Sequence, residues 1–103
     1  MNEKAANIDI PEAEIREFCE RNHIRKLAFF GSVLRDDFGA DSDIDVLVEF
    51  EKGHVPGFDF IRMQDELSTI LGREVDLNTR GFLSPHIRDE VEASAQIEYV
   101  KAR

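Results

Sequence analysis

One stretch decides the fold of this chain, residues 24–50, which read IRKLAFFGSVLRDDFGADSDIDVLVEF. Its apolar first part, 24–30, stops at Gly31, as a buried strand does when it enters a turn. Its last part, 43–50, is the clearest strand, because aliphatic residues recur there at the two-residue period of a strand. One face of this strand can therefore pack on helices, and the other begins with two carboxylates. The aliphatic face holds Ile44, Val46 and Val48, and the opposite face holds Asp43, Asp45 and Leu47.

Helical patterns flank these two strands. Pro11 is suited to the first turn of a helix, and apolar residues follow it at helical spacing up to a stop at Asn22. Residues 1–9 are expected to form a loose leader. A second helix is predicted over 58–71, with apolar residues along one side and Gly72 as its stop. The apolar positions of the two helices are Ile15, Phe18 and Cys19, and then Phe60, Met63, Leu67, Ile70 and Leu71.

Two further elements are predicted, one after residues 24–50 and one within them. A third strand is predicted over 74–79, with two aliphatic side chains on one face and Asp76 on the other. Between the first two strands, Ser32 is expected to cap a short helix that runs to about Asp37.

The end of the chain completes an alternating order of elements. Ser84-Pro85 has the cap and first-turn chemistry of a last helix, and residues 97–100 are expected to form a short terminal strand. This order predicts one domain over residues 1–103, of the α/β (α+β) class. We expect a small mixed sheet with helices packed mainly on one side of it.

The composition fits a small globular domain. The chain has 103 residues, of which 42% are hydrophobic and 34% charged, and this length supports a modest core. It has no apolar run long enough to span a membrane, and its first residues lack the pattern of a secretory signal. The single cysteine, Cys19, cannot form an internal disulfide, so we expect a cytoplasmic location.

The net charge of −9 bears on possible partners. It argues against direct binding of nucleic acid, where affinity comes from neutralising phosphates. It suits a basic protein partner, and it is equally consistent with an acidic surface that only keeps the domain soluble.

Asp43 and Asp45 are the candidate metal ligands. Close carboxylates repel one another unless a cation or a proton lies between them, and magnesium takes oxygen ligands while keeping positions for substrate phosphates. Asp76, on a nearby strand, is placed to supply a third carboxylate. The alternative is that Asp41-Ser42-Asp43 only forms a turn, but the third aspartate favours a metal site.

Gly31-Ser32 is the candidate phosphate-binding turn, because glycine allows a phosphate to approach the backbone and the serine hydroxyl can donate to it. Alone, this dipeptide indicates only an ordinary tight turn. The pair Asp43 and Asp45 that follows it favours nucleotide binding. Arg35, one helical turn beyond Ser32, either contacts phosphate or forms a structural ion pair with Asp36, Asp37 or Asp41, and the ion pair is the more common role.

The three histidines do not indicate a zinc site. His23, His54 and His86 have no shared spacing and no cysteine close to them in the sequence. Cys19 lies on the apolar side of the first predicted helix and is expected to be a core residue.

Taken together, these motifs resemble the nucleotidyltransferase superfamily typified by DNA polymerase beta. FGSVLR at 30–35 and SDIDVLV at 42–48 are similar in particular to the minimal nucleotidyltransferase (MNT) group, as are EVDL at 74–77 and LSP at 83–85. The resemblance covers about residues 24–90.

The resemblance implies a polymerase beta-like fold and a defined chemistry. Asp43 and Asp45 would bind magnesium, with Asp76 as the third carboxylate, and two ions would act together. Gly31 and Ser32 would hold the β- and γ-phosphates of ATP. An acceptor oxygen would attack the α-phosphorus, pyrophosphate would leave, and AMP would stay on the acceptor. Asp76 would also assist deprotonation of the acceptor.

The resemblance also implies a partner. MNT proteins are typically encoded beside HEPN-domain proteins, which are toxic ribonucleases, and the MNT protein is the antitoxin that transfers AMP to a tyrosine hydroxyl of the toxin. Larger relatives carry added domains for their acceptors, and we expect this chain to rely on such a HEPN toxin instead. Two other functions stay open: an antitoxin that masks its toxin without catalysis, and a small-molecule nucleotidyltransferase.

Overall fold

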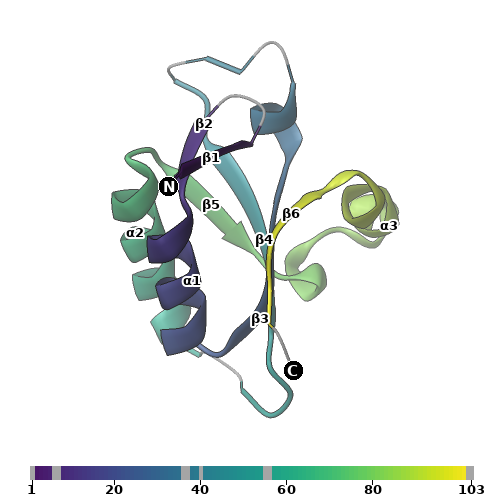
Figure 1. Ribbon diagram of the computed structural model, residues 1–103. Helices are drawn as coiled ribbons and strands as arrows, with labels where there is room; N and C mark the ends of the chain where they lie inside the picture. Colours follow the sequence, from purple (N-terminus) through teal and green to yellow (C-terminus); the bar gives the residue numbers. More distant parts are fainter. Residues whose placement is uncertain (1, 6–7, 36–37, 40, 55–56, 102–103) are drawn as a thin grey trace.

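The computed structural model describes residues 2–5, 8–35, 38–39, 41–54 and 57–101, and for residues 2–5 the backbone alone. A four-stranded sheet with the order β5-β4-β3-β6 forms the centre of the molecule (Figure 1). Its strands are β3 (Ile24–Phe30), β4 (Ile44–Phe50), β5 (Val75–Asn78) and β6 (Gln96–Val100). The helices are α1 (Glu12–Arg21), α2 (Asp59–Leu71) and α3 (Pro85–Ser94), and the short 3-10 helices are η1 (Gly31–Leu34) and η2 (Arg80–Phe82).

The sheet is mixed, as predicted. Strand β3 runs antiparallel to both β4 and β6, whereas β4 and β5 are parallel. Parallel strands need a long crossover, and α2 provides it between β4 and β5. The predicted elements 43–50, 58–71 and 74–79 are each confirmed to within one residue at each end, and the terminal strand begins at residue 96.

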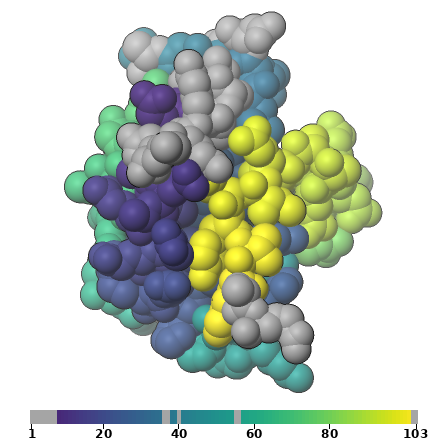
Figure 2. Space-filling view, viewed as in Figure 1, coloured from purple at the N-terminus to yellow at the C-terminus, as the bar shows by residue number. Residues whose placement is uncertain are grey.

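Helices α1 and α2 cover one face of the sheet, and α3 stands on the other side (Figure 1). Figure 2 shows α3 as a projection from the rest of the molecule, with β6 open to view beside it. The prediction that helices pack mainly on one side is therefore confirmed. Within the described ranges, no helix is long and apolar enough to cross a membrane.

The main core lies between the sheet and the pair α1 and α2. The aliphatic face of β4 points into it, because Ile44, Val46 and Val48 are almost completely buried. Cys19 on α1 is fully buried there as predicted, and this burial raises the pKa of its thiol to about 12. The thiol therefore stays protonated and unreactive at neutral pH.

The expected loose leader over residues 1–9 is wrong for the part that the structure describes. Strands β1 (Asn2–Ala5) and β2 (Ile8–Pro11) form an antiparallel hairpin. Ile8 and Ile10 are buried in the main core, because alternate residues of β2 face it. Pro11 is the last residue of this strand and α1 begins at Glu12, so the proline precedes the helix instead of opening it.

The predicted short helix after Gly31 is also corrected. It is a 3-10 helix, η1, whose cap position is Phe30, and Ser32 lies inside it without a capping role. The chain is extended again at Arg35, which ends this helix. Asp36 and Asp37, the predicted end of the helix, lie outside the described residues.

Two helix boundaries follow the sequence signals. Helix α2 ends at Gly72, which has a φ of 70° in the left-handed region, as predicted. Helix α3 begins with Pro85 in its first turn, and the Ser84 hydroxyl accepts a hydrogen bond from the His86 backbone N–H at 3.4 Å.

Candidate active site

Three aspartates come together at one end of the sheet. Asp45 of β4 and Asp76 of β5 are register partners on neighbouring parallel strands, and Asp43 lies directly before β4. Asp45 points away from the α1 and α2 side, because its neighbours Ile44 and Val46 are buried there. Asp43 and Asp76 are exposed and Asp45 is partly buried. The carboxylates therefore lie on the sheet face that α1 and α2 leave uncovered.

The three carboxylates interact electrostatically, and this is seen in the pKa of Asp45. Burial raises the pKa of the Asp45 carboxyl, and repulsion from Asp76 and from Asp43 raises it further, while Arg35 lowers it. The negative charges of Asp43 and Asp76 favour the protonated form of Asp45, and a bound cation would offset the same repulsion. The aspartate cluster is therefore short of positive charge.

Gly31 lies directly against Asp45, since the preceding residue Phe30 is the register partner of Asp45 on β3. A Cβ atom at position 31 would approach Asp45 Oδ2 to 2.2 Å. The φ of Gly31 is also +74°, a left-handed value that other residues rarely adopt. Both the space and the backbone conformation require glycine here, so the turn backbone packs closely on the carboxylate.

Ser32 connects the 3-10 helix to the segment before β4. Its hydroxyl donates a hydrogen bond to the backbone oxygen of Asp43 at 3.3 Å. This contact spans 11 positions of sequence and places the turn beside the first aspartate. Of the two roles considered for Ser32, the helix cap is excluded, and the phosphate contact stays a prediction.

Arg35 is exposed at the end of η1. Its guanidinium lowers the pKa of Asp45, so its positive charge acts on the aspartate cluster. The ion-pair partners expected for Arg35 were Asp36, Asp37 and Asp41, of which the first two lie outside the described residues. Its ion pair and its contact with phosphate both stay predictions.

Arg73 supports the loop before β4 and was not identified from the sequence. Its guanidinium donates hydrogen bonds to the backbone oxygens of Gly39, at 2.5 Å, and Ser42, at 2.9 Å, and lies 4.3 Å from the centre of the Phe38 ring. The hydrogen bonds link positions 31 and 34 residues apart, so no local spacing could have predicted them. Arg73 thereby holds the segment that leads into Asp43.

Two polar side chains of α2 fix the outer edge of β5. Gln64 Oε1 accepts a hydrogen bond from the Leu77 backbone N–H at 2.9 Å, and Ser68 Oγ accepts one from the Val75 N–H at 3.0 Å. These bonds flank Asp76 on both sides and hold its strand in place. A possible sequence signal was the presence of two polar residues four apart on a helix that packs on a strand.

An apolar groove opens on the same face of the sheet as the aspartate cluster. It has a volume of about 230 Å³, and Leu47, two residues beyond Asp45, is one of its walls. Ala95 and Ile97 contribute apolar surface from the segment after α3, and Ile97 remains 54% exposed. A partner that reached the carboxylates from this side would find an apolar surface next to them.

A second group of polar side chains was not anticipated. His23, Glu51 and His54 lie together at the other end of β4, although the histidines are far apart in the sequence. The two imidazole rings stack with their centres 3.9 Å apart. His86 does not belong to this group. The group could not be predicted from sequence spacing. It forms because β4 runs antiparallel to β3, so that the end of β4 lies beside the turn between α1 and β3.

The sequence matches the nucleotidyltransferase domain family over residues 12–98. This is most of the chain, so the protein belongs to that family. A relative from Thermococcus cleftensis, the protein adenylyltransferase MntA, is 36% identical over 80 residues, which are 77% of this chain and 79% of the relative. A candidate protein adenylyltransferase from Methanocaldococcus jannaschii is 33% identical over 85 residues, covering 82% of this chain and 90% of the relative.

Solved structures agree with this assignment. A candidate minimal nucleotidyltransferase has a TM-score of 0.68 and 33% identity, with 82% of this chain and 85% of that chain covered. A toxin–antitoxin complex with AMP-PNP has a TM-score of 0.72 at 19% identity, with coverages of 89% and 75%. A complex of a tri-AMPylated HEPN toxin from Shewanella oneidensis with its MNT antitoxin has a TM-score of 0.63 at 20% identity, with coverages of 87% and 70%. The last two share the fold.

Proposed function

We propose that this protein is a magnesium-dependent protein adenylyltransferase that moves AMP from ATP to a tyrosine hydroxyl of a HEPN toxin, and so acts as its antitoxin. The observation that carries the proposal is the meeting of Asp43, Asp45 and Asp76 beside the backbone of Gly31. Membership of the nucleotidyltransferase family supports the reaction class. The naming of a homologue as a protein adenylyltransferase supports a protein acceptor.

The aspartate cluster fits magnesium by its donor atoms and by its charge. Asp43, Asp45 and Asp76 offer carboxylate oxygens, the ligands that magnesium prefers. Burial raises the pKa of Asp45 most, and repulsion from Asp76 and Asp43, which a cation would remove, raises it further. When bound, two magnesium ions would neutralise the phosphates and stabilise the attacking and leaving oxygens.

The turn at Gly31 and Ser32 is the proposed seat of the β- and γ-phosphates of ATP. Asp45 Oδ2 fills the space that a Cβ of Gly31 would take, and the backbone N–H of Gly31 would be the donor to a phosphate oxygen. The Ser32 hydroxyl would exchange its 3.3 Å hydrogen bond to the Asp43 backbone for one to phosphate. Arg35, whose charge already acts on Asp45, would offer a cation on the same side. These contacts would hold ATP with its α-phosphorus toward the carboxylates.

The transfer step forms one bond and breaks one. The tyrosine oxygen of the toxin attacks the α-phosphorus, the bond from that phosphorus to the bridging oxygen breaks, and pyrophosphate leaves. Asp76 is exposed on the open face and is the proposed acceptor of the tyrosine proton. AMP then remains on the tyrosine through a phosphodiester bond.

The surface around the site supports a protein partner. The carboxylates lie on the sheet face that points away from α1 and α2, near the apolar groove lined by Leu47, Ala95 and Ile97. A net charge of −9 favours association with a basic protein such as a ribonuclease. The Shewanella structure, in which an AMPylated HEPN toxin is bound to an MNT antitoxin, is a precedent for this assignment.

The test is the intact mass of the protein that the neighbouring gene encodes, after incubation with this protein, ATP and magnesium. We expect AMP-sized increments, which disappear when tyrosine is replaced in the toxin and when Asp43→Asn or Asp45→Asn replaces the wild-type enzyme. Asp41→Asn, an exposed aspartate just before the cluster, is the matched control and should leave the increments unchanged. A stable complex that blocks the toxin without any increment would support the purely steric antitoxin instead.

A further inference from the structure

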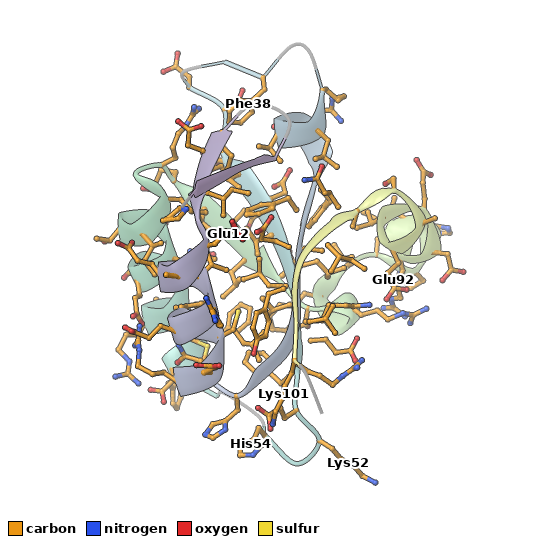
Figure 3. All side chains as sticks on the ribbon, viewed as in Figure 1. Glu12, Phe38, Lys52, His54, Glu92 and Lys101 are labelled. Carbon is orange, nitrogen blue, oxygen red and sulfur yellow. The ribbon has the colours of Figure 1, made fainter. Side chains whose placement is uncertain are left out.

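We infer that His23, Glu51 and His54 form a second metal site, for a divalent transition ion such as zinc, at the end of β4 opposite the aspartate cluster. One nitrogen of each imidazole and one oxygen of the carboxylate would be the ligands. Figure 3 shows the labelled His54 and Lys101 at this end of the sheet. The labelled Phe38, which lies in the loop that leads to Asp43, is at the opposite end. The site is thus separate from the proposed catalytic centre.

The backbone holds the three ligand residues together. His23 lies in the turn between α1 and β3, Glu51 directly follows β4, and His54 follows three residues later. The Glu51 N–H donates to the His23 backbone oxygen at 2.8 Å, and the His54 N–H donates to the Glu51 backbone oxygen at 3.0 Å. Because backbone hydrogen bonds fix the relative positions, only side-chain rotation is needed to adjust the ligand atoms.

The ligand atoms are close to chelating distance. One ligand atom from each of the three residues lies within 4.8 Å of the other two. Zinc–nitrogen bonds of about 2.0–2.1 Å at tetrahedral angles place two ligands of one ion about 3.3 Å apart. The ligand atoms must therefore approach one another by up to about 1.5 Å. Both histidines are exposed, so their rings are able to rotate by this amount.

The donor set selects the class of ion. Two imidazoles and a carboxylate are ligands that zinc accepts, and imidazole also suits copper and nickel. Magnesium prefers oxygen ligands, so the aspartate cluster and this histidine site differ in selectivity. Glu20, Tyr99 and Lys101 line the same recess and leave it open to water, which would complete the coordination.

Lys101 is the internal competitor of the proposed ion. Its Nζ lies 2.8 Å from Glu51 Oε1 in an ion pair, which leaves the other carboxylate oxygen available. Removal of the lysine charge should therefore strengthen metal binding, whereas a purely structural role of Glu51 predicts no such effect.

The test is calorimetric titration of the tag-free full chain with zinc in the presence of excess magnesium. We expect one site, which the double variant His23→Asn/His54→Asn weakens at least about tenfold. Asparagine is chosen at position 23 because His23 has a φ of 56°, and asparagine tolerates this conformation. His86→Asn, on α3, is the matched control and should bind as the wild type does.

Two further variants make the outcome decisive. Lys101→Met should tighten zinc binding by a few fold, because the competing cation is gone. Zinc binding that survives the double histidine variant, or that disappears only in Asp43→Asn/Asp45→Asn, would overturn the site, as would the absence of binding. Cobalt(II) should give visible absorption bands that the double variant loses. None of these readouts involves AMP transfer, so their failure would not bear on the proposed enzyme activity.

Discussion

The two ends of strand β4 place carboxylates in opposite electrostatic settings. Before and at the start of β4, Asp45 is surrounded by Asp43 and Asp76, and its pKa is raised by burial and by their repulsion. After its end, Glu51 is paired with Lys101 and lies beside two histidines, and its pKa is lowered. In the first group, three carboxylates lie close together and repel one another. In the second, the carboxylate of Glu51 already has the Lys101 ammonium as its ion-pair partner.

This difference predicts opposite effects on stability. A raised pKa in the folded state means that the ionised form of Asp45 is destabilising, and the penalty is present above its folded pKa and absent below the ordinary value of 3.8. A lowered pKa means that ionised Glu51 is stabilising above its ordinary value of 4.5, and this contribution is lost as pH falls through the folded pKa. Substitutions at the two ends of β4 therefore test whether the two carboxylates lie in opposite electrostatic settings.

The largest effect is expected for Gly31→Ala. The new methyl group would lie 2.2 Å from Asp45 Oδ2 at a φ of +74°, so we expect transfer to be lost and the free energy of unfolding to fall. Gly72→Ala is the matched control, because Gly72 has a φ of +70° but open space around it, and it should cost only about 1–2 kcal/mol. The clash should add about 1–3 kcal/mol at Gly31.

Urea unfolding of the two glycine variants, together with the AMP-transfer assay, separates strain from clash. Equal losses of stability in Gly31→Ala and Gly72→Ala would show that the approach of the Gly31 backbone to Asp45 is unimportant. Retained transfer in Gly31→Ala would argue against this turn as part of the site.

The second effect is expected for Asp45→Asn. Transfer should fall by about 100-fold or more, because a proposed metal ligand is removed. Without magnesium, the variant should be slightly more stable than the wild type at neutral pH, by less than about 1 kcal/mol, since like-charge repulsion is relieved in a partly exposed site. Thermal unfolding between pH 3 and pH 8 measures this difference, which should vanish at the acidic end. A destabilised variant at neutral pH would contradict the account of the cluster.

A smaller effect is expected for Ser32→Ala. Loss of a hydroxyl that donates to phosphate should weaken binding of a non-hydrolysable ATP analogue by about tenfold, measured by calorimetry with magnesium present. Ser42→Ala is a control for a nearby serine whose hydroxyl accepts a hydrogen bond from the Gly39 N–H. An unchanged affinity in Ser32→Ala would limit the role of Ser32 to its bond with the Asp43 backbone.

The smallest effect is expected for Glu51→Gln without added metal. The melting temperature should fall slightly at neutral pH, because the ion pair with Lys101 is removed, and the difference should disappear below the folded pKa of Glu51. The same substitution in a Lys101→Met background should have less effect, since the partner is already absent. A rise in melting temperature at neutral pH would show that the two ends of β4 do not differ in the way described.

Much of the fold could be predicted because its signals are local. The alternation at Ile44, Val46 and Val48 identified the central strand and its buried face, and Gly72 and Ser84 marked helix boundaries by their own backbone chemistry. The hairpin at the start of the chain was missed, because two short strands without a distinctive turn resemble an unstructured segment. Ile10 is completely buried there because it packs in the main core with residues of α1, α2 and the sheet.

The aspartates and the glycine turn could be identified from spacing, but their arrangement could not. Sequence order placed Asp43 and Asp45 on one strand, and two-residue periodicity placed Asp76 on the face opposite Val75 and Leu77. Only the parallel register of β4 and β5 set Asp45 beside Asp76. Only the packing of the β3–η1 turn put Asp45 Oδ2 where a Cβ of Gly31 would be.

The amino-acid sequence alone was enough to infer the class of fold, the residues of the candidate active site and the family resemblance, because periodicity, turn chemistry and short motifs are properties of neighbouring residues. The tertiary structure decided which distant groups meet: Arg73 with the loop before Asp43, Gln64 and Ser68 with the edge of β5, and His23 with His54 and Glu51. These contacts depend on strand register and on the path of the chain between elements, and no local pattern encodes either of them.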